Sequence, residues 1–172
     1  VSVTTADDDV AGFTVAESSG STSVAESGTT DTFTVVLNAQ PSAAVAFSIS
    51  SSDTGEATVT SLLTFTSANW DTAQTVTVTG VDDDLIDGTQ STTMTIAVID
   101  ASSDDDFDAV DDQTVSVTTT DDDVAGFTIA ETGGSTSVAE SGTTDTFTVV
   151  LDAQPATDVV LTITSSDTGE AT

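Results

Sequence analysis

The chain has 172 residues, of which 30 are Asp or Glu, while Lys, Arg and His are absent, so its formal charge is −30. This balance excludes nucleic acid and anionic membrane surfaces as partners, because no side chain can neutralise a phosphate. The absence of Cys excludes disulfides and thiolate metal sites, and no apolar run approaches the roughly 20 residues that a membrane helix needs.

Apolar residues alternate with Thr and Ser along most of the chain, which predicts β-strands and argues against an acidic disordered tail. Short turns separate seven such segments, a pattern typical of two packed antiparallel sheets with Greek-key connections. The predicted fold is therefore an all-β, Ig-like sandwich. In chain order its strands are expected within residues 13–24, 33–37, 45–49, 59–65, 74–80, 94–98 and 115–117.

The sequence repeats itself with a period of 114 residues. Residues 1–58 align with residues 115–172 without a gap, at 46 identities and 12 differences. Such similarity indicates a tandem array of near-identical units. We expect residues 1–9 to be the last strand and acidic linker of a preceding repeat. Residues 10–123 are then a complete repeat, and residues 124–172 the first three strands of the next.

Acidic residues gather in the expected turns. Glu26 lies before the second expected strand, Asp53 and Glu56 lie in the loop after the third, and further clusters follow the fifth and seventh strands. Loops after alternate strands emerge at the same end of a sandwich, and Ca²⁺ takes six to eight oxygen ligands from carboxylates, carbonyls and water. The sequence therefore predicts a calcium cluster at a domain junction. The later clusters comprise Asp82, Asp83, Asp84 and Asp87, and then Asp121, Asp122 and Asp123.

Another acidic loop contains Asp104, Asp106 and Asp108, which have the spacing of the first ligands of an EF-hand. The rest of that motif is missing, because Ala109 stands where Gly is needed and Val115 where the bidentate Glu belongs. The loop is not an EF-hand. Two interpretations remain, a separate and weaker ion site or a solvated acidic turn.

The order of these motifs resembles the Calx-beta family. A Glu before the second strand and an acidic loop after the third are followed by Leu-Thr-Phe-Thr at 63–66. Then come Gln-Thr-Val-Thr-Val-Thr-Gly-Val-Asp-Asp-Asp-x-x-Asp-Gly at 74–88 and a closing strand that ends in Asp-Asp-Asp. The pattern is most similar to the tandem forms in large bacterial surface proteins and adhesins. Cadherin-like sandwiches are a structural alternative.

The resemblance implies a calcium cluster at one end of the sandwich. The ligands that it implies in the complete repeat are Glu26, Asp53, Asp82, Asp83, Asp84, Asp87, Asp121, Asp122 and Asp123. By repeat symmetry, the residues expected to serve neighbouring units are Asp7, Asp8, Asp9, Glu140 and Asp167.

The sequence bears on three classes of function, namely an enzyme, a structural repeat and a binding module. An enzyme is disfavoured, because His, Cys, Lys, Arg and Tyr are all absent. We expect instead a calcium-rigidified extender or shaft of an extracellular adhesin or surface filament, whose partners are neighbouring repeats and, in a filament, identical chains. The alternative is a calcium-dependent module that binds carbohydrate or protein. The aromatic content of 5% and the near-identical loops of the two copies favour the structural role.

Overall fold

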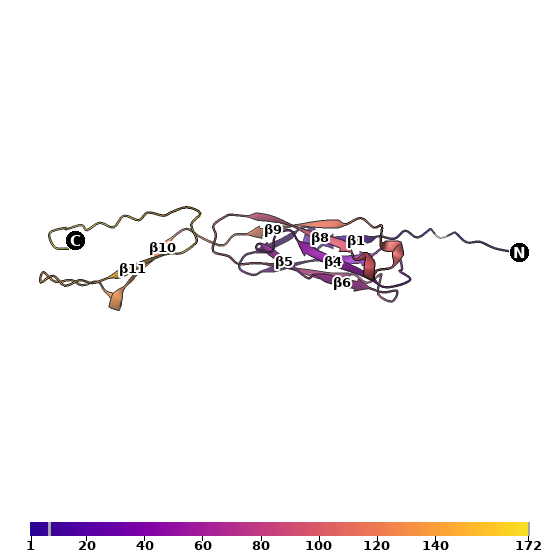
Figure 1. Ribbon diagram of the computed structural model, residues 1–172, viewed down its shortest axis with the longest axis horizontal. Coiled ribbons are helices and arrows are strands. Elements are labelled where there is room, and N and C mark those ends of the chain that lie inside the picture. The colour runs from indigo at the N-terminus through magenta and orange to yellow at the C-terminus, as the bar shows by residue number, and fades with distance from the viewer. Residues whose placement is uncertain (7, 172) are drawn as a thin grey trace. The chain divides into compact units, whose positions relative to one another are not determined.

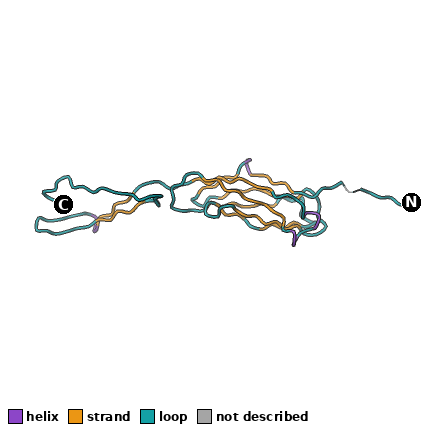
Figure 2. The backbone as a smooth tube through the Cα atoms, turned by 45° about the horizontal axis from the view of Figure 1, so that its top comes forward, coloured by secondary structure: helices purple, strands orange, loops and turns teal. Residues whose placement is uncertain are grey.

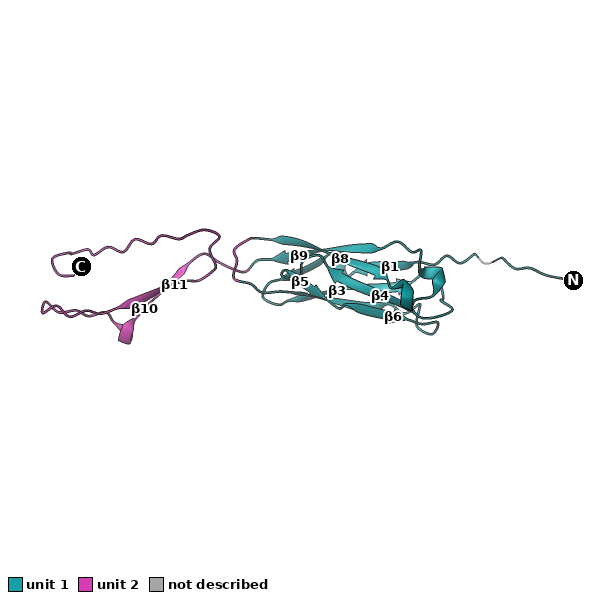
Figure 3. Ribbon diagram, in the orientation of Figure 1, with its two compact units in different colours: residues 1–83, 88–121 teal, residues 84–87, 122–172 magenta. Residues whose placement is uncertain are grey.

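The computed structural model describes residues 1–6 and 8–171 and is all-β. Residues 1–83 and 88–121 form one compact unit, and residues 84–87 and 122–172 form a second (Figure 3). Unit 1 is a sandwich of two sheets (Figure 1). Its strands are β1 (Phe13–Glu17), β2 (Thr22–Ala25), β3 (Thr30–Leu37), β4 (Val45–Ser51), β5 (Ala57–Val59), β6 (Leu62–Phe65), β7 (Gln74–Gly80), β8 (Gln90–Val98) and β9 (Gln113–Thr120).

One sheet has the order β1-β3-β7-β5 and the other the order β2-β9-β8-β4-β6. Neighbouring strands pair antiparallel, except that β2 runs parallel to β9. The turns and loops that join the strands gather at the two ends of the sandwich (Figure 2). The predicted all-β sandwich is thus confirmed. Short 3-10 turns interrupt the strands, and no helix in the described part of the chain has the length and apolar character to cross a membrane.

Two of the seven expected strands are each divided between the sheets. Residues 13–24 form β1 in one sheet and β2 in the other, and residues 57–65 likewise form β5 and β6. The turn at Ser18–Gly20 makes the first crossing, with Ser19 and Gly20 at positive φ. Alternation continues on both sides of each crossing, so the sequence pattern marks strand residues without showing which sheet receives them.

The core lies between the sheets and is built from the inward residue of each alternating pair. Phe47 packs edge to face against two other rings. The ring centroids lie 4.8 Å apart for Phe13 and Phe47, and 5.9 Å apart for Phe47 and Phe65. All three side chains are buried. Trp70 is half-buried and packs at the margin of this core. The chain therefore has one continuous apolar core in unit 1.

Acidic side chains are almost absent from the strands of unit 1. Among residues of β1 to β9, only Glu17, at the end of β1, and Asp31, near the start of β3, carry a carboxylate. Thr and Ser take most of the outward positions, for example Thr75, Thr77 and Thr79 on β7. The charge of unit 1 is therefore concentrated in its turns and loops.

Unit 2 contains one hairpin, formed by β10 (Phe127–Glu131) and β11 (Phe147–Leu151). Its register repeats that of β1 with β3. Residues 159–165, which correspond to β4, are not in a strand, so the predicted third strand of this repeat is wrong for this structure. The physical reason is that β4 pairs with β6 and β8, whose sequences have no second copy in the chain.

We expect Phe47→Ala to destabilise unit 1 by about 3–5 kcal/mol, because it leaves a cavity where the aromatic cluster now packs. Urea unfolding followed by Trp70 fluorescence measures the change. The matched control is Leu62→Ala on edge strand β6, where the side chain is exposed. Equal losses from the two variants would contradict the assignment of the core.

Candidate metal centre

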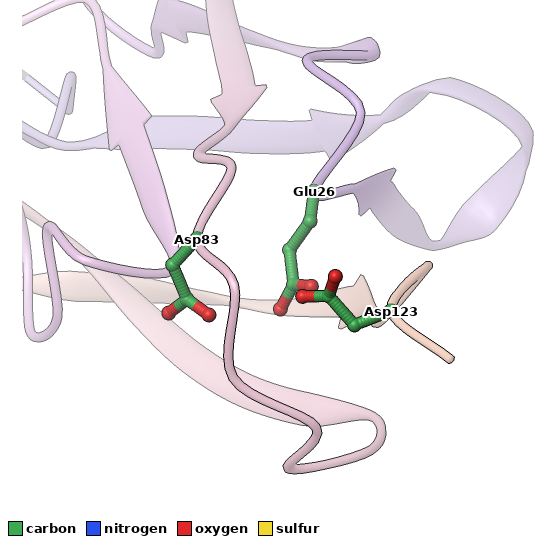
Figure 4. Close-up of side chains that lie close together, drawn as sticks. All are labelled: Glu26, Asp83 and Asp123. Atoms are coloured by element: carbon green, nitrogen blue, oxygen red, sulfur yellow. The ribbon is translucent and has the colours of Figure 1, made fainter. Parts of the chain in front are cut away.

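Three carboxylates converge near the end of the sandwich at which β2, β7 and β9 terminate. Glu26 directly follows β2, Asp83 lies three residues after β7, and Asp123 lies three residues after β9. Each offers one oxygen, and these oxygens all lie within 4.8 Å of one another. Figure 4 shows the three side chains pointing toward a common space. Glu26 is only 1% exposed, Asp123 is half-buried and Asp83 is exposed.

Backbone hydrogen bonds hold the ends of these strands together. The Glu26 N–H donates to the Thr120 carbonyl at 3.1 Å, which continues the parallel pairing of β2 with β9. The Thr22, Val24 and Glu26 side chains are buried while Ser23 is exposed. Glu26 therefore continues the inward-facing series of β2 and carries its carboxylate toward the interior.

Gly80 allows β7 to pass very close to β2. A Cβ atom at this position would clash with the Ala25 carbonyl. The Gly80 N–H donates to the Thr29 carbonyl at 3.0 Å, and the next N–H, of Val81, donates to the Glu56 carbonyl at 2.9 Å. These contacts bring the segment that carries Asp83 to the end of β2. Gly80 is therefore a positioning residue for the acidic trio formed by Glu26, Asp83 and Asp123.

The trio has the geometry and chemistry of a calcium site. Ca²⁺ binds oxygen at about 2.3–2.6 Å, so two oxygens on one ion lie at most about 5 Å apart, and oxygens that all lie within 4.8 Å of one another meet this limit. All three donors are carboxylates, the hard oxygen ligands that calcium takes. The residues present therefore fit Ca²⁺.

The neighbouring acids of the predicted cluster are not part of this group of three. Asp121 is half-buried, and its Oδ2 accepts a hydrogen bond from the Gly88 N–H at 2.8 Å, which ties the loop after β7 to the end of β9. Asp82 and Asp122 are exposed. The residues assigned to the adjoining segment of unit 2, Asp84 and Asp87, are exposed as well.

Asp53 is used by its own turn. Its Oδ1 accepts from the Gly55 N–H at 2.9 Å, and the Ser51 hydroxyl donates to its carbonyl at 2.8 Å. Asp167 makes the same turn in unit 2, with the Gly169 N–H at 2.9 Å from its Oδ1. An Asp two residues before a Gly is typical of this turn. The structure therefore places Asp53 and Asp167 in a backbone-stabilising role and does not bring Asp53 into the trio.

The residues expected to serve neighbouring repeats lie apart from a formed cluster. Asp8 and Asp9 are exposed ahead of β1, and Asp7 lies outside the described residues. Glu140, the counterpart of Glu26, is exposed in unit 2. The counterpart of Glu26 is thus present in unit 2 without the burial that Glu26 has in unit 1.

Glu56 is a candidate that the predicted ligand set omitted. Its backbone pairs with Val81 beside the trio, and its side chain is half-buried. The Asp-Thr-Gly turn that precedes Glu56 is the sequence feature that could have identified it. Once the Asp53 carboxylate is assigned to the Asp-Thr-Gly turn, Glu56 is the remaining acid of that loop.

The Asp104 loop has a structural role. Asp104 is 6% exposed, and its Oδ2 accepts from the Ser42 N–H, the Ser42 hydroxyl and the Ala43 N–H at 2.6–2.8 Å. Its Oδ1 accepts from the Asp106 N–H at 3.2 Å. The hydrogen bonds, led by the Ser42 hydroxyl, lower the pKa of Asp104 below its ordinary value of 3.8. Both oxygens therefore fasten this loop to the segment before β4.

Asp106 and Asp108 do not join Asp104 in a group of three convergent carboxylates within the described residues. Both side chains are exposed. Desolvation raises the pKa of Asp108, and the charges of Asp100, Asp105 and Asp104 raise it further. Of the two interpretations of this loop, its geometry favours the acidic turn.

Gly80→Ala is expected to separate Asp83 from Glu26 and to weaken calcium binding by on the order of tenfold or more. Isothermal titration calorimetry on the full chain measures this change. Gly88→Ala in the following loop is the control, since a Cβ there meets no neighbour although its φ of 73° is strained. Unchanged affinity in folded Gly80→Ala would contradict the positioning role.

Asp104→Asn should lower the melting temperature by several degrees at pH 6 and by less at pH 3. The folded pKa lies below the ordinary value, so ionised Asp104 contributes stability above about pH 4 that is lost as the pH falls through the lowered pKa. Thermal unfolding across this range measures the difference between variant and parent. Asp71→Asn, at an exposed turn, is the control. A difference that does not depend on pH would contradict the assignment.

Comparisons with known proteins give distant similarities. No protein-family model matches the chain, and no curated protein matches it. An apo Calx CBD1 domain matches 67% of this chain and 100% of its own, at 15% identity and a TM-score of 0.47. SSP-19, an MSP-domain-like protein of Caenorhabditis elegans, covers 59% of this chain and 92% of its own, at 17% identity and 0.38. The E. coli chaperone DraB covers 67% and 59%, at 8% identity and 0.46. At these values, the likenesses carry no conclusion about what this chain binds.

Proposed function

We propose that this chain is a calcium-stabilised structural repeat, an extender or shaft segment of an extracellular adhesin or surface filament. The observation that carries the proposal is the acidic trio, in which a carboxylate with 1% exposure lies within 4.8 Å of two others.

The trio concentrates charge that the chain has no side chain to neutralise. Two carboxylates 4 Å apart repel by about 1 kcal/mol in water and by about 4 kcal/mol at the effective dielectric near a protein surface. The sequence contains no Lys, Arg or His, so a cation from solution has to offset this repulsion. A divalent ion bound by Glu26, Asp83 and Asp123 does so directly, with water and backbone carbonyls to complete its six to eight oxygens.

The form of the chain supports a structural role. The near-identical repeat makes a quasi-one-dimensional array in which each unit depends on its neighbours in sequence, and those neighbours are the proposed partners. Only three residues separate Asp123 from the next repeat's first strand, β10, which begins at Phe127. An ion held by Asp123 therefore acts on the segment that leads into the following repeat. Restricting that segment is how calcium would stiffen the array.

A calcium-dependent binding module is the alternative. Such a module usually presents aromatic side chains or loops that vary between repeats, whereas the loop residues 26–29 are identical to 140–143. The outward strand positions carry Thr and Ser in place of aromatic rings. Catalysis is not proposed, because the chain has no His, Cys, Lys, Arg or Tyr, the residues that supply most general bases and activate most nucleophiles. A glycan array probed with the calcium-loaded chain tests the alternative, which specific and calcium-dependent binding would favour.

Calcium is expected to bind with a Kd of about 10⁻⁴–10⁻³ M, the range of extracellular modules. At 100 times the Kd it should stabilise unit 1 by about 2.7 kcal/mol. Titration calorimetry measures the affinity, and thermal melting with calcium and with EDTA measures the stabilisation. Glu26→Gln, which keeps the shape and removes the charge, should abolish most of both effects.

Asp71→Asn serves as the matched control for this experiment, because it removes one negative charge from an exposed turn away from the three strand ends. It should leave calcium affinity within about twofold of the parent, since exposed charges are largely screened by salt. Identical melting in calcium and EDTA for the parent chain would refute the proposed function. Equal losses from Glu26→Gln and Asp71→Asn would show that calcium responds to total charge, without a site at Glu26.

A further inference from the structure

The second strand of unit 1, β2, lies beside the last strand, β9. β2 pairs in parallel with β9, from Thr22 opposite Val117 to Ala25 opposite Thr120. The Glu26 N–H adds a further hydrogen bond to the Thr120 carbonyl at 3.1 Å. The β2–β9 pair is parallel, whereas the other strand pairs of this sandwich are antiparallel. A strand close to the entry of the unit is therefore hydrogen-bonded directly to the strand along which the chain leaves it.

Strand direction decides how this ladder responds to tension. β1 and β9 both run toward the end of the sandwich that carries the acidic trio, since β1 is antiparallel to β3, which leaves that end, and β2 is parallel to β9. A pull on the chain ends draws β1 and β2 back toward the entry end and draws β9 toward the exit. β1 must then slide along β3, and β2 along β9, so that the hydrogen bonds within each pair bear the load together.

The C-terminal end of β2 has to move in this sliding, and several contacts hold it in place. The Ala25 N–H donates to the Thr29 hydroxyl at 2.7 Å, the Ala25 carbonyl accepts from the Gly28 N–H at 3.2 Å, and Gly80 packs against that carbonyl. Glu26 follows directly, with its carboxylate in the trio. Sliding β2 toward the entry end would draw Glu26 away from Asp83 and Asp123.

We propose that β2 and β9 form a shear-resisting clamp that bears tension along the repeat, and that the acidic trio is its calcium-dependent latch. The latch rests on the proposed calcium binding, whereas the clamp follows from strand direction and pairing alone. An ion at the trio would join the end of β2 to the loop after β7 and to the exit of β9. It would therefore have to lose ligands before β2 could slide.

Single-molecule force spectroscopy on the full chain tests the proposal. The chain has no Cys, so each pair of introduced cysteines gives a unique pair of attachment points. Ser21→Cys with Val124→Cys, at two exposed positions, pulls β2 against β9 in shear without loading β1. Ala44→Cys with Ala68→Cys instead pulls apart β4 and edge strand β6 from the Val45–Phe65 pair, one hydrogen bond after another.

In EDTA, the shear geometry is expected to require a several-fold higher unfolding force than the peeling geometry at the same loading rate, because forced unfolding reports the unfolding barrier. Calcium should raise the shear force further and leave the peeling force nearly unchanged. Glu26→Gln should remove the calcium increment in shear and keep the difference between the two geometries. Asp83→Asn, at an exposed loop position, provides the same test if Glu26→Gln does not fold.

The outcomes separate the two proposals. Equal forces in the two geometries in EDTA would overturn the clamp, whatever calcium does. Calcium that binds by calorimetry and leaves the shear force unchanged would overturn the latch while the proposed function stands. If no calcium binds, the proposed function fails and the latch with it, while the ratio of shear to peeling force in EDTA still decides the clamp.

Discussion

The distribution of negative charge constrains this protein more than any other feature. A chain with a formal charge of −30 and no basic side chain cannot place carboxylates on the facing strands of a sandwich without strong repulsion. Thr and Ser occupy most of the outward strand positions instead, because their branched or small polar side chains suit strand geometry and stay soluble without charge. The carboxylates are left to the turns and loops, where solvent, backbone N–H groups or a bound cation can stabilise them.

Carboxylates in these turns are stabilised in two ways. Asp53 and Asp104 accept hydrogen bonds from backbone N–H groups, and those bonds close a turn in one case and fasten a loop in the other. Glu26, Asp83 and Asp123 are brought together from three separate strand ends. The close approach of Gly80 to Ala25 is what allows this convergence. Packing of the fold and assembly of the candidate site thus depend on the same backbone contact.

The two copies of the repeat show which structural features depend on local sequence alone. The β10–β11 hairpin forms with the register of β1 and β3, because the residues that specify it are local. Burial does not follow, since Phe13 is 3% exposed and its counterpart Phe127 is 50% exposed. Their surroundings differ because strands β6 to β8, which contribute to the core of unit 1, have no second copy in the sequence. Two almost identical segments therefore differ in burial, because burial depends on pairing with strands that are distant in the sequence.

The sequence by itself determined the all-β class, the 114-residue repeat, the approximate strands and the restriction of acids to turns, because two-residue alternation and turn chemistry are local properties. Only the tertiary structure decided that β1 and β2, and likewise β5 and β6, divide between sheets. It also decided which acids meet. Nothing local distinguishes Asp83 from its neighbours in the Asp-Asp-Asp run, because the approach of Gly80 on β7 to Ala25 on β2, two strands of different sheets, determines which carboxylate lies near Glu26. Turn chemistry could have assigned Asp53 to its own turn, whereas the burial of Glu26 required the parallel pairing of β2 with β9, a contact between residues nearly one hundred positions apart.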